Sequence, residues 1–307
     1  MPFVDPPALP DYASALKRLE RRAYRIELGP DAGKRLHFVD HGQRSATPVL
    51  FMHGNPTWSF LWRRVIACLD PARFRCLAPD LLGFGLSDDL SARPGDHTLA
   101  RHLDVLGEWL RAIDPRELIL VGQDWGGPLV IGSNLRLDQG QRAKGVVLGN
   151  TSVLVPTRPR GTRFHRFARS PLLSDLVFRG LGFPQRLGLR QVQGDPASIG
   201  GAVGRAYREP LRGWRRRSGP LGLARMVPSS SDHPSVPLLR EIEAWSRSWQ
   251  GPTALVWGKR DPILGRALKR HREAFPQASV RETEAGHFLQ EEVPELLAAA
   301  VAEVADA

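Results

Sequence analysis

Long apolar runs and cysteines are both scarce in this 307-residue chain. No apolar run is long enough to cross a bilayer, and the first residues lack the basic and apolar regions of a secretory signal. The two cysteines, Cys68 and Cys76, are too few for a disulfide framework or a metal cluster. A reducing, cytoplasmic location is therefore the simplest expectation, with no metal and no membrane partner.

Lysine is also scarce, so the formal net charge of +11 comes mostly from arginine. Such a charge can mark a protein that binds nucleic acid. Most of the arginines are dispersed, however, and the densest group surrounds Trp214 in a region expected to be helical: Arg212, Arg215, Arg216 and Arg217. We interpret this group as a solvated helix face and expect no nucleic-acid partner.

The apolar runs that are present alternate with helical segments over most of the chain. Leucines at helical spacing predict a helix over 98–113, and Pro294 opens a closing helix that extends to residue 305. Strands are predicted at 22–28, 34–40, 49–52, 74–78, 118–121, 145–148, 253–257 and 278–282. This alternation predicts an α/β protein with a doubly wound, mostly parallel sheet.

The alternation fails between residues 152 and 250, which contain proline, glycine, arginine and scattered aromatic residues. We interpret 152–250 as a helical cap inserted into a core domain formed by residues 1–151 and 251–307. Ligands of open α/β sheets bind at the carboxyl ends of the strands, so a cap there would shield the site from water. The following side chains are expected either to line a dry pocket or to pack within the cap: Phe164, Phe167, Phe178, Phe183 and Leu221.

The strand predicted at 118–121 leads into a Gly-Gln-Asp-Trp-Gly segment at 122–126. A sharp strand-to-helix turn of this kind exposes its central side chain, here Asp124, above the sheet. A carboxylate in that place can displace a leaving group from a saturated carbon and form an ester, which water can cleave. A serine would form an ether, which water cannot cleave there. Asp124 is therefore a candidate nucleophile, although it could also cap the following helix.

Two further polar residues follow later strands, in the order expected for a catalytic triad. Asp261 follows the strand predicted at 253–257, and His287 follows the strand predicted at 278–282. Both are therefore expected at the sheet edge that carries Asp124. In this arrangement His287 activates the water that cleaves the ester, and Asp261 orients the imidazole ring.

Asn55 and Trp125 are candidate donors for the developing negative charge. Asn55 follows the strand predicted at 49–52, so the backbone N–H groups of Asn55 and Trp125 are expected to form an oxyanion hole. Their amide and indole side chains are neutral donors, which suit a departing halide because it needs charge stabilisation but no proton. Trp125 could instead pack in the core, and Asn55 could serve the turn before Pro56.

Four motifs resemble those of the haloalkane dehalogenases in the α/β-hydrolase superfamily: residues 53–63, 80–88, 123–127 and 286–292. The resemblance covers most of the core and is weaker in the cap. It implies the α/β-hydrolase fold with an inserted cap, the catalytic residues Asp124, Asp261 and His287, and halide binding by Asn55 and Trp125. It also implies a small apolar halogenated substrate and no cofactor, and a homo-oligomer is a possible assembly.

Branches of this family differ in two of these positions. One branch has a catalytic Glu after the sixth strand of the sheet, where this chain has Asn150, so Asp261 is the better candidate for the acid. Another branch uses a cap tryptophan in place of the Asn. Asn55 makes that unnecessary, although Trp214 or Trp245 could still take the role.

Other activities occur on the same framework. Epoxide hydrolases use two cap tyrosines to protonate the opening ring, whereas Tyr207 is the only tyrosine of this cap. The β-lactone decarboxylases share the Asp, the Trp and the His-Gly-Asn-Pro loop with this chain, so they stay the main alternative. A non-catalytic ligand receptor is a further alternative, because fold and site are separable.

Overall fold

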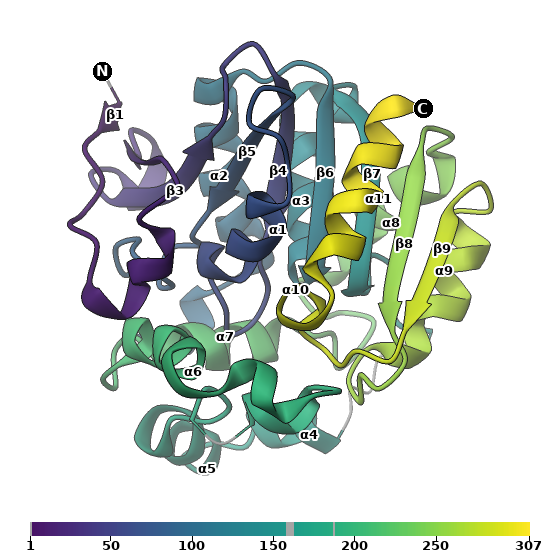
Figure 1. Cartoon of the computed structure of the whole chain (residues 1–307). Helices are drawn as coiled ribbons and strands as arrows, with labels where there is room; N and C mark the ends of the chain where they lie inside the picture. Colours follow the sequence, from purple (N-terminus) through teal and green to yellow (C-terminus); the bar gives the residue numbers. More distant parts are fainter. Residues whose placement is uncertain (1, 158–162, 187) are drawn as a thin grey trace.

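The computed structural model describes residues 2–157, 163–186 and 188–307 and contains one nine-stranded sheet (Figure 1). Its spatial order is β1-β2-β3-β5-β4-β6-β7-β8-β9; the pairs from β1 to β5 are antiparallel, and the pairs from β5 to β9 are parallel. The strands are β1 (Phe3–Val4), β2 (Arg21–Arg25), β3 (Arg35–His41), β4 (Thr47–Met52), β5 (Phe74–Pro79), β6 (Leu118–Asp124), β7 (Ala143–Thr151), β8 (Thr253–Gly258) and β9 (Ser279–Thr283).

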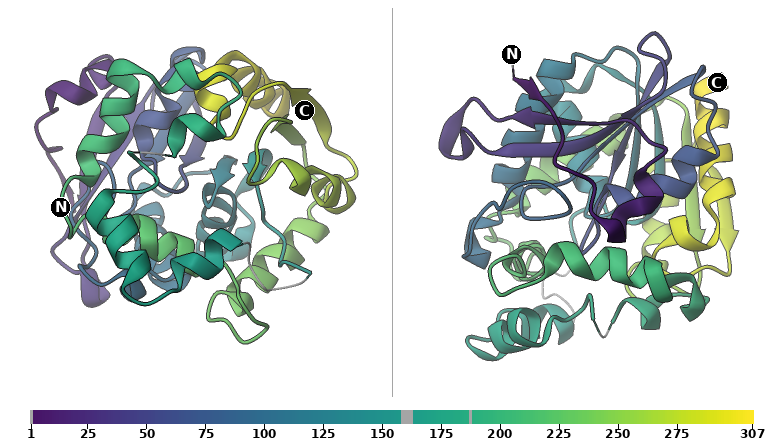
Figure 2. Two further views of the ribbon diagram at one scale, coloured as in Figure 1. Left: turned by 90° about the horizontal axis from the view of Figure 1, so that it is seen from below. Right: turned by 60° about the vertical axis from the view of Figure 1, so that its left-hand side comes forward.

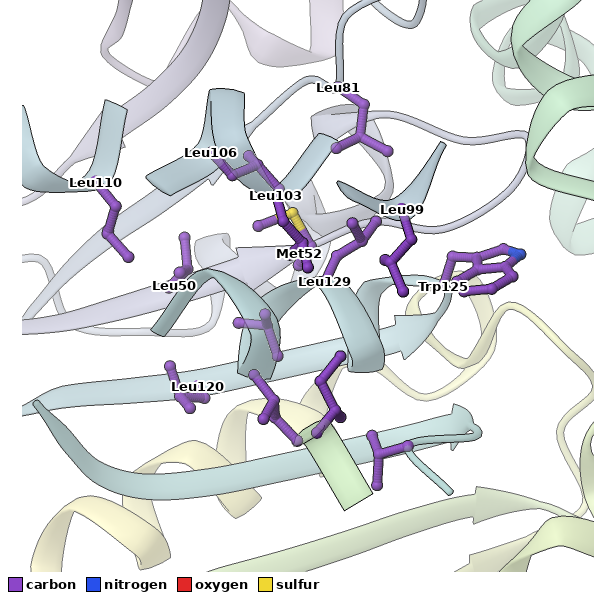
Figure 3. Packing of buried hydrophobic residues seen from close by; sticks show 14 of the residues in the cluster. Leu50, Met52, Leu81, Leu99, Leu103, Leu106, Leu110, Leu120, Trp125 and Leu129 are labelled. Carbon is purple, nitrogen blue, oxygen red and sulfur yellow. The ribbon is translucent and has the colours of Figure 1, made fainter. Parts of the chain in front are cut away.

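Helices cover both faces of the sheet, and successive side chains of a strand alternate between the two faces. In β4, Leu50 and Met52 belong to a buried cluster with leucines of α2 and α3 (Figure 3). Val49 and Phe51 belong to the cluster on the opposite face, with side chains of α1 and α11. The helices of the core are α1 (Arg63–Ala67), α2 (Leu99–Ile113), α3 (Gly126–Arg136), α8 (Val236–Ser248), α9 (Leu268–Ala274), α10 (Leu289–Glu292) and α11 (Pro294–Asp306).

The second helix illustrates how local sequence sets these elements. The side chain of Thr98 accepts a hydrogen bond from the backbone N–H of Arg101 and caps the first turn. The helix ends where Asp114 adopts a left-handed conformation with a φ of 47°. Between these ends, the leucines that predicted the helix point into the sheet (Figure 3): Leu99, Leu103, Leu106 and Leu110.

Each predicted strand overlaps an observed one, and the doubly wound, mostly parallel sheet is confirmed. The two-residue strand β1 was not predicted, because so short a segment has no periodicity of its own. The predicted helices over 98–113 and 294–305 correspond to α2 and α11. No helix in the described parts of the chain is long and apolar enough to cross a membrane.

A layer of short helices lies across the end of the sheet to which the parallel strands point (Figure 1, Figure 2). The α-helices are α4 (Arg163–Ala168), α5 (Leu173–Asp175), α6 (Gly201–Arg208) and α7 (Ser218–Met226). A π-helical turn, η6, spans Leu176–Leu181, and 3₁₀ turns span η7 (Leu189–Val192), η8 (Pro196–Ile199) and η9 (Glu209–Leu211). These elements form the central part of the predicted cap.

The last part of the predicted cap has a different environment. α8 packs beside α3, with buried Ile242 close to Gly132 and Leu103. This helix therefore covers the sheet as the other core helices do. The cap boundary at residue 250 stays a prediction, and the packing of α8 favours an end near residue 235.

The arginine group around Trp214 is not a helix face, so that expectation was wrong. Residues 212–217 form a turn between η9 and α7. Arg217 is buried and donates hydrogen bonds to the carbonyl groups of Leu211 and Arg179. Closely spaced arginines in a turn can point in different directions, which sequence spacing alone does not reveal.

The aromatic residues expected in the cap pack on one another. Phe178 lies 5.7 Å from Phe164 and 5.6 Å from Phe183 between ring centroids, and buried Leu221 belongs to the same cluster. Phe167 stacks on Phe178 at 6.3 Å. These contacts build the interior of the cap, and a role in lining a substrate pocket stays a prediction.

Candidate active site

The end of β6, where the chain turns into α3, holds Asp124 in a conformation that few side chains adopt. Its φ is +53°, which is costly for a residue other than glycine and is typical of a strained functional turn. Two glycines make room for it. A Cβ at Gly126 would collide with the Met52 carbonyl, and a Cβ at Gly54 would overlap the Asp124 carboxylate. The two glycines therefore let the end of β4 and its following loop approach the turn that carries the nucleophile.

The carboxylate of Asp124 is held from one side and open on the other. Its Oδ1 accepts a hydrogen bond from the backbone N–H of Asn55 at 2.8 Å, and the backbone N–H of Trp125 also stabilises the carboxylate. About 15% of its side-chain surface is still accessible. Burial raises the pKa of Asp124, although His287 and the two N–H donors act in the opposite direction.

His287 and Asp261 lie where two adjacent strand ends bring them together. The Nδ1 atom of His287 is 2.9 Å from Oδ2 of Asp261, and Oδ1 of Asp261 accepts the N–H of Ile263 at 2.7 Å. With its proton on Nδ1, the ring directs the lone pair of Nε2 toward Asp124, whose Oδ2 is 3.7 Å away. The structure therefore brings the three predicted residues together.

Opposing effects act on the imidazole of His287. Burial lowers the pKa of His287, but the charge and hydrogen bond of Asp261 and the charge of Asp124 outweigh it, so the net shift is upward. The ring is only 1% exposed. The two carboxylates therefore favour the charged imidazolium, the form that a general base reaches after taking a proton.

Asn150 joins the loops that carry the acid and the base. Its Oδ1 accepts the N–H of Gly258 at 2.8 Å, and its Nδ2 donates to the carbonyl of Gly286 at 2.9 Å. The side chain is fully buried, and the residue has a φ of +36°. An amide fits this position because it can donate and accept at once. The sequence excluded Asn150 as the acid but did not suggest this bridge.

Gln123 is a second buried amide that sequence reasoning did not assign. Its Nε2 donates to the backbone carbonyl of His287 at 3.0 Å and lies 3.2 Å from Nε2 of the same ring. The signal that could have identified it is a polar side chain in an otherwise apolar strand, directly before the nucleophile. Such a residue has to be satisfied by hydrogen bonds within the protein.

The cap holds the loop of His287 from the opposite side. The N–H of His287 donates to the carbonyl of Val192 at 2.8 Å, and the N–H of Phe288 donates to Oε1 of Gln193 at 2.8 Å. The carboxylate of Glu292 accepts N–H groups from Gly194 in the cap and from Gly286 in the core. The position of the base thus depends on both domains, a long-range effect that no local pattern predicts.

The two candidate halide donors lie beside the nucleophile, and they differ in how many of their N–H groups already donate a hydrogen bond within the protein. One N–H of the Asn55 amide donates to the carbonyl of Pro220 in α7 at 3.0 Å, which leaves its second N–H for a ligand. Trp125 is 8% exposed, and no described residue accepts a hydrogen bond from its indole nitrogen. Figure 3 shows this nitrogen pointing away from the leucine cluster against which the ring packs. Trp125 is therefore both a core aromatic and an available donor.

The remaining aromatic candidates lie elsewhere. Trp214 is half exposed and packs under the guanidinium of Arg179, and Trp245 stacks on Trp249. The hydroxyl of Tyr207 donates to the buried carboxylate of Glu291 at 2.5 Å. Because the single cap tyrosine is used in this way, the structure gives no support to ring protonation by tyrosine.

Known proteins share both this fold and much of this sequence. Residues 47–294 match the family model described as the alpha/beta hydrolase fold. Haloalkane dehalogenase 2 of Mycobacterium bovis is 34% identical over 88% of this chain and 91% of its own length. The haloalkane dehalogenase of Psychrobacter cryohalolentis is 30% identical over 94% of this chain and 92% of its own. The tetrameric structure of haloalkane dehalogenase DpaA from Paraglaciecola agarilytica has a TM-score of 0.78 and 24% identity, with 98% of each chain covered.

The parallel sheet, the turn at Asp124 and the matched family model make this chain an α/β-hydrolase. The relatives narrow that assignment, because their identities of 30% and 34% extend over most of both sequences. The chain belongs to the haloalkane dehalogenase family. The resemblance recognised in the four sequence motifs is thereby confirmed.

Proposed function

We propose that the protein hydrolyses haloalkanes to an alcohol, a halide ion and a proton through an ester formed on Asp124. The observation that carries this proposal is a carboxylate at the exposed centre of the turn, with a buried histidine 3.7 Å away. A carboxylate nucleophile suits attack at saturated carbon, since its product is an ester that water can cleave. The family relationship supports the same reaction.

In the first step, Oδ2 of Asp124 attacks the carbon that carries the halogen. The carbon–oxygen bond forms as the carbon–halogen bond breaks, and the halide leaves with the bonding electron pair. The indole N–H of Trp125 and the free amide N–H of Asn55 stabilise its charge. His287 is not needed for this displacement, because no proton moves.

In the second step, His287 takes a proton from a water molecule through Nε2, and the hydroxyl attacks Cγ of Asp124. Negative charge develops on Oδ1, which already accepts the backbone N–H of Asn55, and the backbone N–H of Trp125 also stabilises this carboxylate. Collapse of this intermediate releases the alcohol, which carries Oδ2 and a proton, and leaves one oxygen of water on Asp124. Asp261 keeps the imidazole oriented and stabilises its charged form.

The proposed substrate is small, apolar and halogenated, and no metal or organic cofactor is assigned a role. A β-lactone decarboxylase would use the same residues, and the family relationship favours dehalogenation over it. A homo-oligomer and a cytoplasmic location stay predictions. The structure of DpaA is tetrameric, and this describes DpaA and not the present chain.

The His287→Phe variant tests the mechanism. With a bromoalkane in excess, it should release one equivalent of bromide per active site and then stop, with the alkyl mass retained on Asp124. Asp124→Ala should release none, which controls for reaction at other nucleophiles. Continued turnover by His287→Phe would contradict the role of the base. A parallel assay with a cis-β-lactone separates the two activities: decarboxylation without bromide release would replace the proposed function.

A further inference from the structure

The net charge of the protein is concentrated in the cap. Residues 152–235, between β7 and α8, contain 15 arginines and four acidic residues, which give this segment a formal net charge of +11. The rest of the chain contains 28 basic and 28 acidic residues and is formally neutral. The whole positive excess therefore lies in the segment that covers the strand ends (Figure 1).

Only part of this charge is neutralised inside the cap. Arg179 and Arg225 share the carboxylate of Asp175, at 2.7 and 3.2 Å. Other cap arginines are exposed and have no carboxylate partner among the described residues: Arg166, Arg186, Arg190, Arg205 and Arg208. Surface cations without a counter-charge create a positive electrostatic potential, which attracts a polyanionic surface.

Exposed apolar side chains gather in the same segment. Eight large apolar residues are exposed in the described parts of the chain, and five of them form what we call the apolar cap patch: Leu172, Leu173, Leu176, Leu181 and Trp214. Leu172 is 85% exposed. Leu176 and Trp214 both lie close to Gly180, within 3.3 and 3.8 Å of the position a Cβ would take there. α5 and the following turn form the outer edge of the cap, away from the sheet (Figure 1, Figure 2).

Cations surround the apolar cap patch. The guanidinium of Arg179 lies 4.3 Å from the ring centroid of Trp214. The side chain of Arg186 packs at Gly182, next to Leu181. Arg212 and Arg215 flank Trp214 along the chain. Each has a carboxylate neighbour, Glu209 at 3.8 Å and Asp89 at 2.9 Å, yet their side chains are still 81% and 67% exposed. The surface thus combines apolar side chains at its centre with long cationic side chains at its rim.

This combination decides among possible partners. A second cap would bring two segments of charge +11 together, so self-association through this surface is unfavourable. A nucleic acid duplex would satisfy the arginines but would leave the leucines exposed to water, because it presents its charged phosphates outward and keeps its bases stacked inside. An anionic lipid bilayer satisfies both, since leucine and tryptophan enter the interface while arginine binds the headgroup phosphates.

We propose that the apolar cap patch and its arginine rim dock the protein on the surface of an anionic lipid bilayer. Docking is peripheral and needs no spanning helix, and it departs from the expectation of no membrane partner. It would place the cap at the interface where apolar molecules accumulate. That consequence rests on the proposed function, whereas the docking itself does not.

Flotation of the full-length protein with vesicles tests the docking. Vesicles of phosphatidylcholine with about one third phosphatidylglycerol should bind the protein, and pure phosphatidylcholine should bind it at least about tenfold more weakly. Binding should also fall as salt is raised. The double variant Leu172→Ser/Leu176→Ser should lose about tenfold or more in vesicle binding, because two leucines no longer enter the interface. Arg186→Gln/Arg212→Gln should lose a similar amount.

Matched controls come from the core side of the molecule. Arg240→Gln/Arg247→Gln removes the same charge from exposed positions on α8, and Leu28→Ser replaces an exposed leucine outside the cap. Both should keep vesicle binding within about twofold. Trp214 should become accessible to quenching by doxyl-labelled lipid, measured as the difference from Trp214→Phe. Absence of vesicle binding would overturn the proposal. Equal binding by the leucine variant, together with tight binding of duplex DNA, would replace it with a purely electrostatic polyanion site.

These measurements distinguish a failure of the docking proposal from a failure of the proposed function. Halide release from a water-soluble bromoalkane should be unchanged in Leu172→Ser/Leu176→Ser, because both side chains lie on the outer face of the cap. Loss of vesicle binding with unchanged halide release supports docking by this patch. Vesicle binding without any halide release would instead contradict the proposed function and leave the docking intact.

Discussion

The core and the cap are built on different principles. The core is formally neutral and contains the nine-stranded sheet and the longest helices, whereas the cap segment carries +11 and its described part consists of short α, 3₁₀ and π elements. All side chains of the proposed active site come from the core: Asn55, Asp124, Trp125, Asp261 and His287. The cap contributes hydrogen bonds that hold two of them, through Pro220 and Val192. The reacting side chains therefore lie at the carboxyl edge of the sheet, and hydrogen bonds to the cap help to hold two of them in place.

One buried cluster joins the two regions. Arg63 of the core forms a two-pronged ion pair with Glu291, at 2.6 and 2.8 Å, and the hydroxyl of Tyr207 in α6 donates to the same carboxylate. The indole N–H of Trp58 adds a hydrogen bond to the carbonyl of Ala206 at 3.1 Å. The cap is thus anchored to the buried carboxylate of Glu291. Removing one partner of its ion pair with Arg63 would leave the other charge buried and uncompensated, which strongly destabilises a protein.

The largest effect on stability is expected for Glu291→Gln. This change leaves the buried guanidinium of Arg63 without a counter-charge and should lower the free energy of unfolding by about 3–5 kcal/mol. Tyr207→Phe removes one hydrogen bond to a charged group and should cost about 1.5–3 kcal/mol. Chemical denaturation measures both values. As a control, Asp104→Asn disrupts the exposed pair with Arg136 and should cost less than about 1 kcal/mol. Equal costs for the buried and exposed pairs would contradict the anchoring role.

The same division explains how far the sequence could be interpreted. The strands of the core have continuous apolar runs, and Asp124, Asp261 and His287 each follow one of them, so topology alone placed them at one edge. The cap has no comparable periodicity, and its arginines at 212–217 were wrongly expected on a helix. The roles of Asn150 and Gln123 could not be predicted, because their hydrogen-bond partners are backbone groups of loops far away in the sequence. Hydrogen bonds of that kind depend on the folded geometry and leave no local pattern.

A smaller effect is expected where the core positions the base. Asn150→Gly removes both side-chain hydrogen bonds between the acid and base loops, and glycine avoids the strain that alanine would have at this positive φ. Hydrolysis of the ester should slow by about 10- to 100-fold, because a small displacement of His287 disturbs the attack of water. Alkylation of Asp124 should change little.

Rapid-quench measurement of the two steps distinguishes these outcomes, since the ester accumulates when only hydrolysis slows. Asn134→Ala provides the control, because Asn134 is also a buried amide but donates to the carbonyl of Gly140 in a distant turn. It should reduce stability without changing the ratio of the two rates. If Asn150→Gly slowed both steps equally, Asn150 would act on the fold and not on the base.

The corresponding contact from the cap should matter less. Gln193→Ala removes the acceptor for the N–H of Phe288, next to the base, while the hydrogen bond from His287 to the carbonyl of Val192 persists. We expect hydrolysis to slow by about fivefold, the equivalent of the one hydrogen bond from the N–H of Phe288, although the bonds that Gln193 donates to Ser198 and to the Phe288 carbonyl are lost as well. Gln191→Ala changes an exposed residue of the same segment and should have no effect on either step. If ester hydrolysis slowed more in Gln193→Ala than in Asn150→Gly, the cap and not the core would contribute more to the position of the base.

The last test compares the pH dependence of the two chemical steps. Hydrolysis requires neutral His287, so it is fully active above the pKa of His287 and declines as pH falls through it. Asp261 raises the pKa of His287, whereas the charge of Asp124, which also raises it in the free enzyme, is absent from the ester, so the acid limb of turnover should follow the imidazole supported by Asp261 alone. Bromide release by His287→Phe in a single turnover needs only ionised Asp124 and should persist to lower pH, even though burial raises the pKa of Asp124. Coincident acid limbs in the two proteins would mean that the nucleophile, and not the base, controls the response to pH.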